Sequence, residues 1–393
     1  MMFIRYLIIA LVFVMPAAAE PLNPVRIRLN SELVLVAPLA SDDTGAARTE
    51  GPLGEIGLSA RIEKLLDNGL RLRGYGALRL QKDHPQRPGG AGAFGSAIAG
   101  TNSIPGAFSG FSDGPALTSD SLRGRVETAF FQIDGGYGEV RFGKDRGVAA
   151  RFYEGTPTVL DFARLDTPLL DPSGLGIIRS RHDLTGPSPK ISYASPRILG
   201  VRAGLSHTLI VSADGLDRRT GIAADNDDEK IRHAAEFALN SRHLLRQADL
   251  RIETALAWSR GTRKDTQLSD AESDIDTFSA GALINWSDIL IGASWLDSNN
   301  GRRDSAYEAW SAGIETAWQG LDWSLEHGRA NDKGIGLNSE SWRLASAWRP
   351  NRDVKLALAL TNEDLNRFDY SASSTGLVFE ITLSKKILNL DGN

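Results

Sequence analysis

Two groups of charged residues have types and spacing that could act on ions. Arginines alternate with apolar residues in the first third of the chain, as in Arg26-Ile27-Arg28 and Arg71-Leu72-Arg73. The stretch 152–178 instead holds four carboxylates and one arginine. A guanidinium stays charged even beside other cations, and rings of fixed charge set ion selectivity where they line a pore. The candidate basic residues are Arg26, Arg28, Arg61, Arg71, Arg73, Arg123 and Arg125, and the candidate acidic residues are Glu154, Asp161, Asp166 and Asp171.

Other chemistry finds little support in the sequence. The chain has no cysteine, which excludes disulfides, thiolate metal sites and thiol catalysis. Its six histidines have no metal-ligand spacing, and no Ser/His/Asp set is indicated by position. The acidic run 225–229 lacks the glycine and the spacing of a calcium loop. A net charge of −5 argues against nucleic acid as a partner, and no cofactor is implied.

The elements that carry these charges are predicted to be β-strands. In residues 24–36, apolar side chains occupy one face and Arg26, Arg28 and Glu32 the other, which is the period of two expected of a strand. The same pattern places Val126 and Phe130 together on the apolar face, opposite Arg125. It recurs along the chain and predicts about 16 strands, joined alternately by tight turns and by longer loops. That alternation is typical of an outer-membrane barrel.

The tryptophans predict where this barrel meets the membrane. All eight fall near strand ends in the expected register, at either the loop ends or the turn ends. Indole rings favour the headgroup level of a bilayer, so two aromatic girdles are expected. Ordinary core tryptophans near strand ends are the alternative. The predicted girdle residues are Trp258, Trp286, Trp295, Trp310, Trp318, Trp323, Trp342 and Trp348.

One connection, residues 144–189, is too long and too apolar for an ordinary surface loop. Connections longer than about 15 residues without structure of their own are usually functional or disordered, and Phe152, Leu160, Phe162 and Ile178 among others argue against disorder. We expect this stretch to fold back inside the barrel and narrow it.

The first residues predict export. Arg5 precedes an apolar run from Leu7 to Met15, and Ala17-Ala18-Ala19 gives a small-residue cleavage pattern, so residues 1–19 are interpreted as a signal peptide. Residues 20–393 are then one barrel domain, an all-β transmembrane antiparallel barrel with 144–189 as its constriction loop.

The mature chain resembles the Gram-negative general-diffusion porins, which are trimeric outer-membrane proteins. The resemblance is carried by Gly-Glu-Val-Arg-Phe-Gly-Lys-Asp (138–145) before the long connection and by Lys-Ile-Ser-Tyr-Ala-Ser-Pro (190–196) after it. It implies a homotrimer in outer-membrane lipid, without enzymatic activity, that passes ions and small hydrophilic solutes by diffusion. It also implies that the acidic third loop faces basic residues of the early strands.

The signs of the charges match that implication, although bases at both ends of the segment reduce the contrast. Lumen-facing positions of the first five predicted strands carry nine arginines and five glutamates, but each arginine could simply pair with a local glutamate. The whole segment 144–189 is close to neutral, so the sequence leaves ion selectivity open. The alternatives are a substrate-selective barrel channel, a barrel enzyme that acts on lipid, and a structural or adhesive barrel with a plugged lumen.

Overall fold

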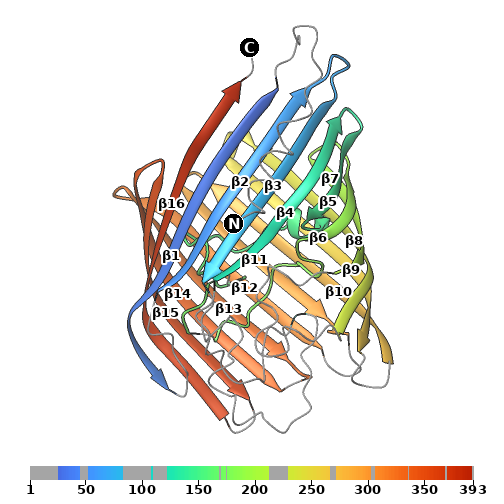
Figure 1. The fold of residues 1–393 in the computed structure, drawn as a ribbon. Helices are drawn as coiled ribbons and strands as arrows, with labels where there is room; N and C mark the ends of the chain where they lie inside the picture. Colours follow the sequence, from blue (N-terminus) through green and yellow to red (C-terminus); the bar gives the residue numbers. More distant parts are fainter. Residues whose placement is uncertain are drawn as a thin grey trace.

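Alternation of apolar and polar side chains along nearly every segment gives a single closed β-barrel (Figure 1). In this computed structural model the strands pair antiparallel with their neighbours in sequence, and β1 closes the barrel by pairing with β16. Closure leaves no strand edge unpaired, which a sheet in lipid requires. The structure describes residues 25–44, 52–82, 108, 122–167, 170–173, 175–211, 229–265, 271–301, 306–334, 336–367 and 370–391.

The predicted signal peptide lies outside these residues. The strands are β1 (Arg26–Thr44), β2 (Leu53–Leu65), β3 (Arg71–Lys82), β4 (Leu122–Gly135), β5 (Gly138–Asp145), β6 (Ser188–Ala194), β7 (Val201–Ile210), β8 (Glu229–Leu245), β9 (Leu250–Asp265), β10 (Ala271–Trp286), β11 (Ile289–Ser298), β12 (Tyr307–Trp318), β13 (Leu321–Asp332), β14 (Leu337–Asn351), β15 (Val354–Arg367) and β16 (Tyr370–Asp391). No helix among the described residues is long and apolar enough to cross a membrane.

Tight turns gather at one end of the barrel and longer connections at the other. Each even-numbered strand from β2 to β14 is joined to the next strand by a short turn, such as 66–70 between β2 and β3 and 136–137 between β4 and β5. Gly69, Ser287 and Gln319 in such turns have positive φ, as tight hairpins require. We call the end with the tight turns the turn end, which is uppermost in Figure 1, and the opposite end the loop end.

The prediction that Phe130 shares the apolar outer face with Val126 is wrong. The β3–β4 pairing has a bulge between Ala77 and Leu78, where the partner residue jumps from Thr128 to Val126. A one-residue shift moves every later side chain to the other face. Phe130 therefore faces the lumen, where its ring lies 5.5 Å from that of Tyr75, and Arg141 covers it at 4.7 Å.

The first and last strands are longer than their sequence patterns indicate. Alternation in β1 fades after Val36, yet the strand continues to Thr44 because it pairs with β16 along its length. A register shift between Pro38 and Ala40 accommodates the proline, which cannot donate to the ladder. Strand length here is set by the partner rather than by local alternation.

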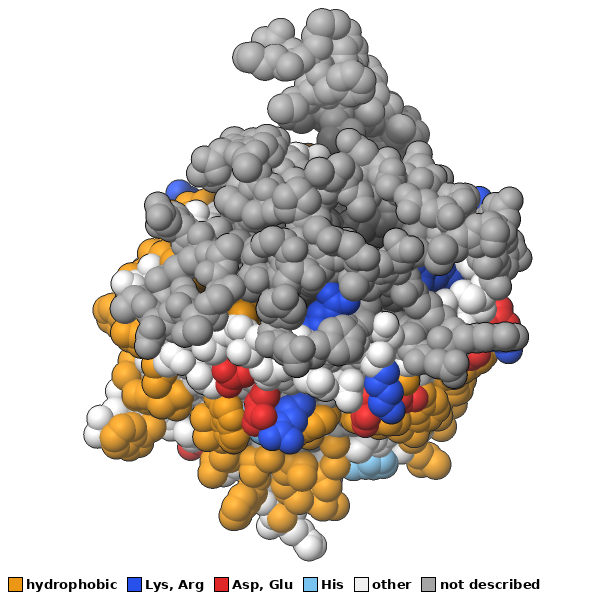
Figure 2. Space-filling view, turned by 90° about the horizontal axis from the view of Figure 1, so that it is seen from below, with side chains coloured by type: hydrophobic (Ala, Val, Ile, Leu, Met, Phe, Trp, Pro, Cys, Tyr) orange, Lys and Arg blue, Asp and Glu red, His pale blue; other side chains and the backbone are white. Residues whose placement is uncertain are grey.

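The best buried apolar residues lie inside the barrel. Val34, Val36 and Leu53 of β1 and β2 pack with Leu160 and Phe162 from the connection between β5 and β6. The outer wall carries the opposite pattern, with many large apolar side chains exposed. Figure 2, which looks at the loop end, shows hydrophobic side chains covering the outer wall and charged side chains gathered along the rim. The barrel is thus apolar outside and lined inside by a segment of its own chain.

Candidate functional site

The connection between β5 and β6, here called the inner segment (residues 146–187), enters the lumen and lies against the wall. It begins with the short helix α3 (Val148–Arg151). Glu236 of β8 accepts hydrogen bonds from the backbone N–H of Ala149 at 3.3 Å and from the Thr185 hydroxyl at 2.6 Å. One wall carboxylate therefore fixes both the entry and the exit of the segment.

The middle of the inner segment crosses β12 to β16. The Thr156 and Ser311 hydroxyl oxygens are 2.5 Å apart, and the Val159 N–H donates to Ser324 at 3.2 Å. Glu380 of β16 accepts three backbone N–H groups, from residues 161, 162 and 163, at 2.8, 3.1 and 2.9 Å. A buried backbone N–H group that is not paired within a sheet or helix needs a side-chain acceptor of this kind.

Returning toward β6, the segment covers β9 to β12. The Tyr307 hydroxyl donates to the Ile177 carbonyl at 2.8 Å and accepts the Arg179 N–H at 2.9 Å. His182 contacts the hydroxyls of Ser259 and Ser279 at 2.7 and 2.8 Å. The segment is therefore hydrogen-bonded to one continuous part of the wall, from β8 to β16.

Glycines in the wall give the inner segment its room. A Cβ on Gly281 of β10 would lie 1.8 Å from the Glu154 carbonyl oxygen, and one on Gly292 of β11 would lie 2.2 Å from that of Gly155. Real Cβ atoms do not approach so closely. These strand glycines mark a close approach of two backbones, a signal that the sequence analysis missed.

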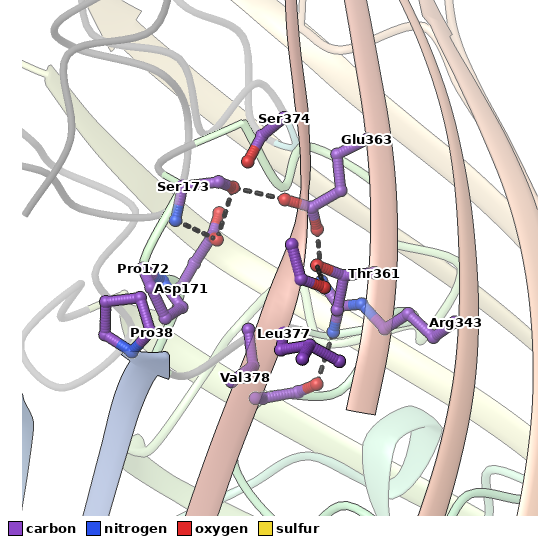
Figure 3. Close-up of a pocket in the computed structure, with 12 residues that line it drawn as sticks. Pro38, Asp171, Pro172, Ser173, Arg343, Thr361, Glu363, Ser374, Leu377 and Val378 are labelled. Carbon is purple, nitrogen blue, oxygen red and sulfur yellow. Dashed lines mark hydrogen bonds and ion pairs between the residues drawn. The ribbon is translucent and has the colours of Figure 1, made fainter. Parts of the chain in front are cut away.

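Near β14 and β15 the segment is held by a buried charged group (Figure 3). The Ser173 hydroxyl donates to Asp171 at 2.7 Å and contacts Glu363, while Arg343 pairs with Glu363 and donates to the Ala163 carbonyl. Four of the wall glutamates that hold the segment are nearly fully buried, namely Glu236, Glu326, Glu363 and Glu380. The sequence analysis did not single out any of them.

The predicted acidic residues of the segment divide into two pairs. Asp166 and Asp171 are 0% and 1% exposed, because their carboxylates bond within the segment and do not face open lumen. The Asp161 side chain is 42% exposed and pairs with Lys355 at 2.7 Å. Glu154 is partly exposed and accepts a hydrogen bond from Asn240 at 3.0 Å. Only Asp161 and Glu154 are thus presented toward the lumen.

The charge state of two of these carboxylates follows from their surroundings. Burial opposes ionisation of Asp166, but the charge of Arg164, which donates two hydrogen bonds at 2.9 and 3.0 Å, holds its pKa below the ordinary value. Burial and a hydrogen bond with Glu253 raise the pKa of Glu154 to about 7. Asp166 is therefore a fixed anion neutralised by its arginine, whereas Glu154 titrates near neutral pH.

Several arginines of the inner segment stay partly exposed. They are Arg146, Arg151, Arg164 and Arg181. Arg181 lies over the Tyr153 ring at 5.4 Å, and Arg151 pairs with Glu139 of β5. Glu139 also binds Arg141 and Arg202, at 3.0 and 3.2 Å. Arg141 has a second carboxylate, Asp145, at 2.9 Å, so three guanidinium groups share two carboxylates.

The predicted basic wall also divides in two. Near the inner segment, Arg79 is held by Glu32, Glu55 and Glu127 at 2.7, 2.8 and 2.6 Å and lies over the Phe162 ring at 5.5 Å. Arg79 thus joins the wall to the segment, and its charge is fully matched. Arg125 contacts Gln81 at 3.0 Å and Glu55 at 3.9 Å.

Toward the turn end, arginines outnumber carboxylates. Arg61, Arg71 and Arg73 all reach Glu63, and Arg28 stands opposite Arg61 in the β1–β2 register. Arg26 lies opposite Glu63 and Asp391, one on each neighbouring strand. Arg123 lies opposite Gln81, and its side chain is outside the description. The structure therefore brings most of the predicted arginines to one side of the lumen.

The tryptophans all point outward, and they occupy one half of the barrel. Trp295 and Trp310 pair in register toward the loop end, while Trp318 and Trp323 lie toward the turn end with ring centroids 6.4 Å apart. All eight lie on β9 to β14, as the strand bounds show.

Comparison with known proteins places this fold. A family model described as Gram-negative porin matches residues 29–367. No curated protein matches the sequence significantly.

Solved structures match over nearly the whole chain but share little sequence. The anion-selective porin from Comamonas acidovorans is 12% identical with a TM-score of 0.55, covering 92% of this chain and 100% of that one. The outer membrane channel DcaP of Acinetobacter baumannii is 10% identical with a TM-score of 0.57 and coverage of 94% and 100%. OmpF of Salmonella typhi, solved with daunomycin, is 11% identical with a TM-score of 0.57 and coverage of 92% and 98%.

At these identities the structures establish the fold, and the family model covers most of the chain. The lipid-acting enzyme considered from the sequence has no place in this family of channels. The chain belongs to the Gram-negative porin family and forms a diffusion channel in the outer membrane.

Proposed function

We propose that this porin prefers anions among the small hydrophilic solutes and ions that it passes. One arrangement of charges supports the preference most strongly. The inner segment buries Asp166 and Asp171 and leaves Arg146 and Arg181 partly exposed. The charge that it offers to solutes is therefore more basic than its composition indicates.

The opposite wall adds to the same sign. Arg61, Arg71 and Arg73 share Glu63, and Glu139 is shared by Arg202, by Arg151 of the inner segment and by Arg141, which also pairs with Asp145. Fixed charge of one sign along a pore raises the local concentration of counter-ions and favours their passage. The inner segment is proposed to be the constriction at which this selection is strongest. The Comamonas porin has the same fold, but at 12% identity its selectivity does not carry over, so the preference rests on this chain's own charges.

The experiment is a reversal-potential measurement on refolded protein in a planar bilayer under a potassium chloride gradient. Chloride should be more permeant than potassium. Arg146→Gln should shift the ratio toward potassium, and Asp161→Asn should shift it toward chloride, because each removes one partly exposed charge. A wild-type pore that prefers potassium would overturn the proposed selectivity.

We further propose a homotrimer whose subunits meet through β2 to β5. The outer face of these strands carries no tryptophan and has an apolar groove lined by Ala60, Ile62, Gly74, Gly76 and Phe142. A Cβ on Gly74 or Gly76 would meet nothing within 4 Å, so the groove has room for side chains of a second copy. One solved structure with this fold, OmpT of Vibrio cholerae, is described in a trimer form.

Light scattering on refolded protein tests the assembly. Gly76→Leu should raise the monomer fraction by filling the groove, whereas Ala293→Leu, on the exposed outer face of β11, should not. Equal behaviour of the two variants, or a monomeric wild type, would mean that lipid rather than protein covers the groove.

A further inference from the structure

A cluster of arginines lies in the lumen toward the turn end, away from the inner segment. It consists of Arg28, Arg61, Arg71 and Arg73, here called the turn-end cluster, on three adjacent strands. In the register Arg28 stands opposite Arg61, Arg73 opposite Glu63, and Arg71 opposite Asp134. Four guanidinium groups thus share two carboxylates among the described residues that face them in register.

The contacts of this cluster are loose. Arg61, Arg71 and Arg73 approach the single Glu63 carboxylate at 3.6, 3.2 and 3.5 Å. Arg79, on the same strand as Arg71 and Arg73, has three carboxylates of its own at 2.6 to 2.8 Å. A charge-assisted hydrogen bond is normally about 2.7–2.9 Å long. The turn-end cluster therefore lacks the tight acceptors that match Arg79.

Donor atoms within the cluster are left without acceptors. The Nε atoms of Arg61 and Arg73 are buried and have no hydrogen-bond partner in the part of the chain that the structure describes. A buried donor without an acceptor is costly, and so is like charge at close range. The guanidinium ends remain accessible from the lumen, since the Arg61 and Arg71 side chains are 35% and 46% exposed.

We propose that the turn-end cluster is a binding site for oxyanions with two or more negative charges, of which inorganic phosphate is the simplest. Each arginine offers a planar fork that matches two oxygens of such an anion. Bound there, the anion would give the exposed guanidinium ends of Arg61 and Arg71 a closer acceptor than Glu63 and relieve the repulsion between Arg28 and Arg61. The proposal rests on the proposed function only in that the anion reaches the cluster through the lumen.

This site is separate from the constriction. Arg73 lies six residues along β3 from Arg79, which contacts the inner segment. At about 3.3 Å per residue the two arginines are about 20 Å apart along the strand. An anion would therefore meet two stations in succession, and at the turn-end station three arginines approach the single Glu63 carboxylate.

Isothermal titration of detergent-refolded protein with inorganic phosphate, at low chloride, tests the site without requiring conduction. The double variant Arg61→Gln/Arg73→Gln removes two forks and should weaken phosphate binding at least about tenfold. The matched control is Arg260→Gln/Arg329→Gln, because each of these arginines pairs with one carboxylate on the outer face, at 2.5 and 2.7 Å. It should bind phosphate like wild type. Heat-modifiable migration on a gel confirms that each variant is folded.

Equal phosphate affinity in wild type and the turn-end variant would overturn the site. In bilayers, phosphate should reduce the chloride current of wild type and do so less in the turn-end variant, while neutral sucrose should not distinguish them. Phosphate binding by a folded protein that conducts nothing would support the site and overturn the proposed pore function. The two proposals therefore fail separately.

Discussion

At the scale of single residues, Glu380 carries the heaviest share of the inner segment's attachment. Its carboxylate accepts three consecutive backbone N–H groups and is 1% exposed. Glu380→Ala leaves these donors without their acceptor, which should cost on the order of 3 kcal/mol of stability. The temperature at which the barrel unfolds, followed by gel mobility, should fall by several degrees, and single-channel current should become noisier.

A matched substitution separates this attachment from a general loss of a glutamate. Glu308→Ala removes an exposed carboxylate from the outer face, where it accepts only the Trp295 indole N–H at 3.0 Å among its described contacts. It should unfold within about one degree of wild type. If Glu380→Ala and Glu308→Ala unfolded at the same temperature and gave single-channel currents with equal noise, Glu380 would not hold the segment.

Glu154 should give the pore a pH dependence near neutrality. Its pKa of about 7 lies above the ordinary 4.5 because of burial and the hydrogen bond with Glu253. Folded protein therefore holds this proton where unfolded chain has lost it, so stability falls as pH rises from about 4.5 through about 7 and is level above that. Over the upper part of this window Glu154 becomes charged, and chloride preference should decline between about pH 6 and pH 8.

The check is the reversal potential measured across that pH range in wild type and in Glu154→Gln. The variant cannot gain the charge, so its ratio should stay flat. A decline that persists unchanged in Glu154→Gln would assign the effect to another titratable group.

At the residue scale, the sequence was enough to place the predicted arginines of the wall but not the predicted acidic residues of the inner segment. Strand alternation was enough to place Arg61, Arg71 and Arg73 in the lumen, because alternation fixes which face a side chain takes. No such rule exists for the inner segment, which has little regular structure. Whether Asp166 faces solvent or Arg164 depends on the fold of that segment, and composition alone predicted an acidic surface where the structure has a buried ion pair.

At the scale of elements, strands and inner segment fit because lumen-facing glycines let the two backbones approach. Gly281→Ala would place a Cβ 1.8 Å from the Glu154 carbonyl oxygen, and backbone cannot give way as a flexible side chain can. The substitution should displace the segment near Glu154, change single-channel conductance and lower the unfolding temperature.

Gly74→Ala is the control, since it also lies within a strand but its Cβ would meet nothing within 4 Å. It should conduct like wild type. Wild-type conductance and stability in Gly281→Ala would mean that the segment does not lie against β10.

Most elements could be predicted because alternation of apolar and polar side chains reports one buried and one exposed face. Prediction from this alternation failed where the pairing of two strands, rather than the sequence pattern of one strand, determines the structure. The bulge at Glu127, opposite Ala77 and Leu78, turns Phe130 into the lumen, and β1 extends past Val36 because β16 supports it. Neither event has a local signature apart from Pro38, whose position at a register shift is visible only once the partner strand is known.

At the scale of the whole molecule, the barrel has two unlike halves. The outer face of β9 to β14 carries every tryptophan, while β2 to β5 carry glycine and alanine around a groove. Inside, the inner segment covers β8 to β16, and the predicted basic residues lie on β1 to β4. The positions of the tryptophans near strand ends could be predicted from the register, but their confinement to one side becomes meaningful only when the chain is closed into a ring.

The central claim is that the inner segment lies against the wall and leaves a conducting, basic lumen beside it. A disulfide tests it directly, because the chain has no cysteine and the Thr156 and Ser311 hydroxyls are 2.5 Å apart. The measurement is single-channel conductance of Thr156→Cys/Ser311→Cys before and after oxidation, with the cross-link read from gel mobility of the unfolded chain. We predict that the disulfide forms and that conductance and chloride preference stay those of the reduced pore. Failure of the folded variant to cross-link, or current that vanishes on oxidation and returns with reductant, would contradict the account.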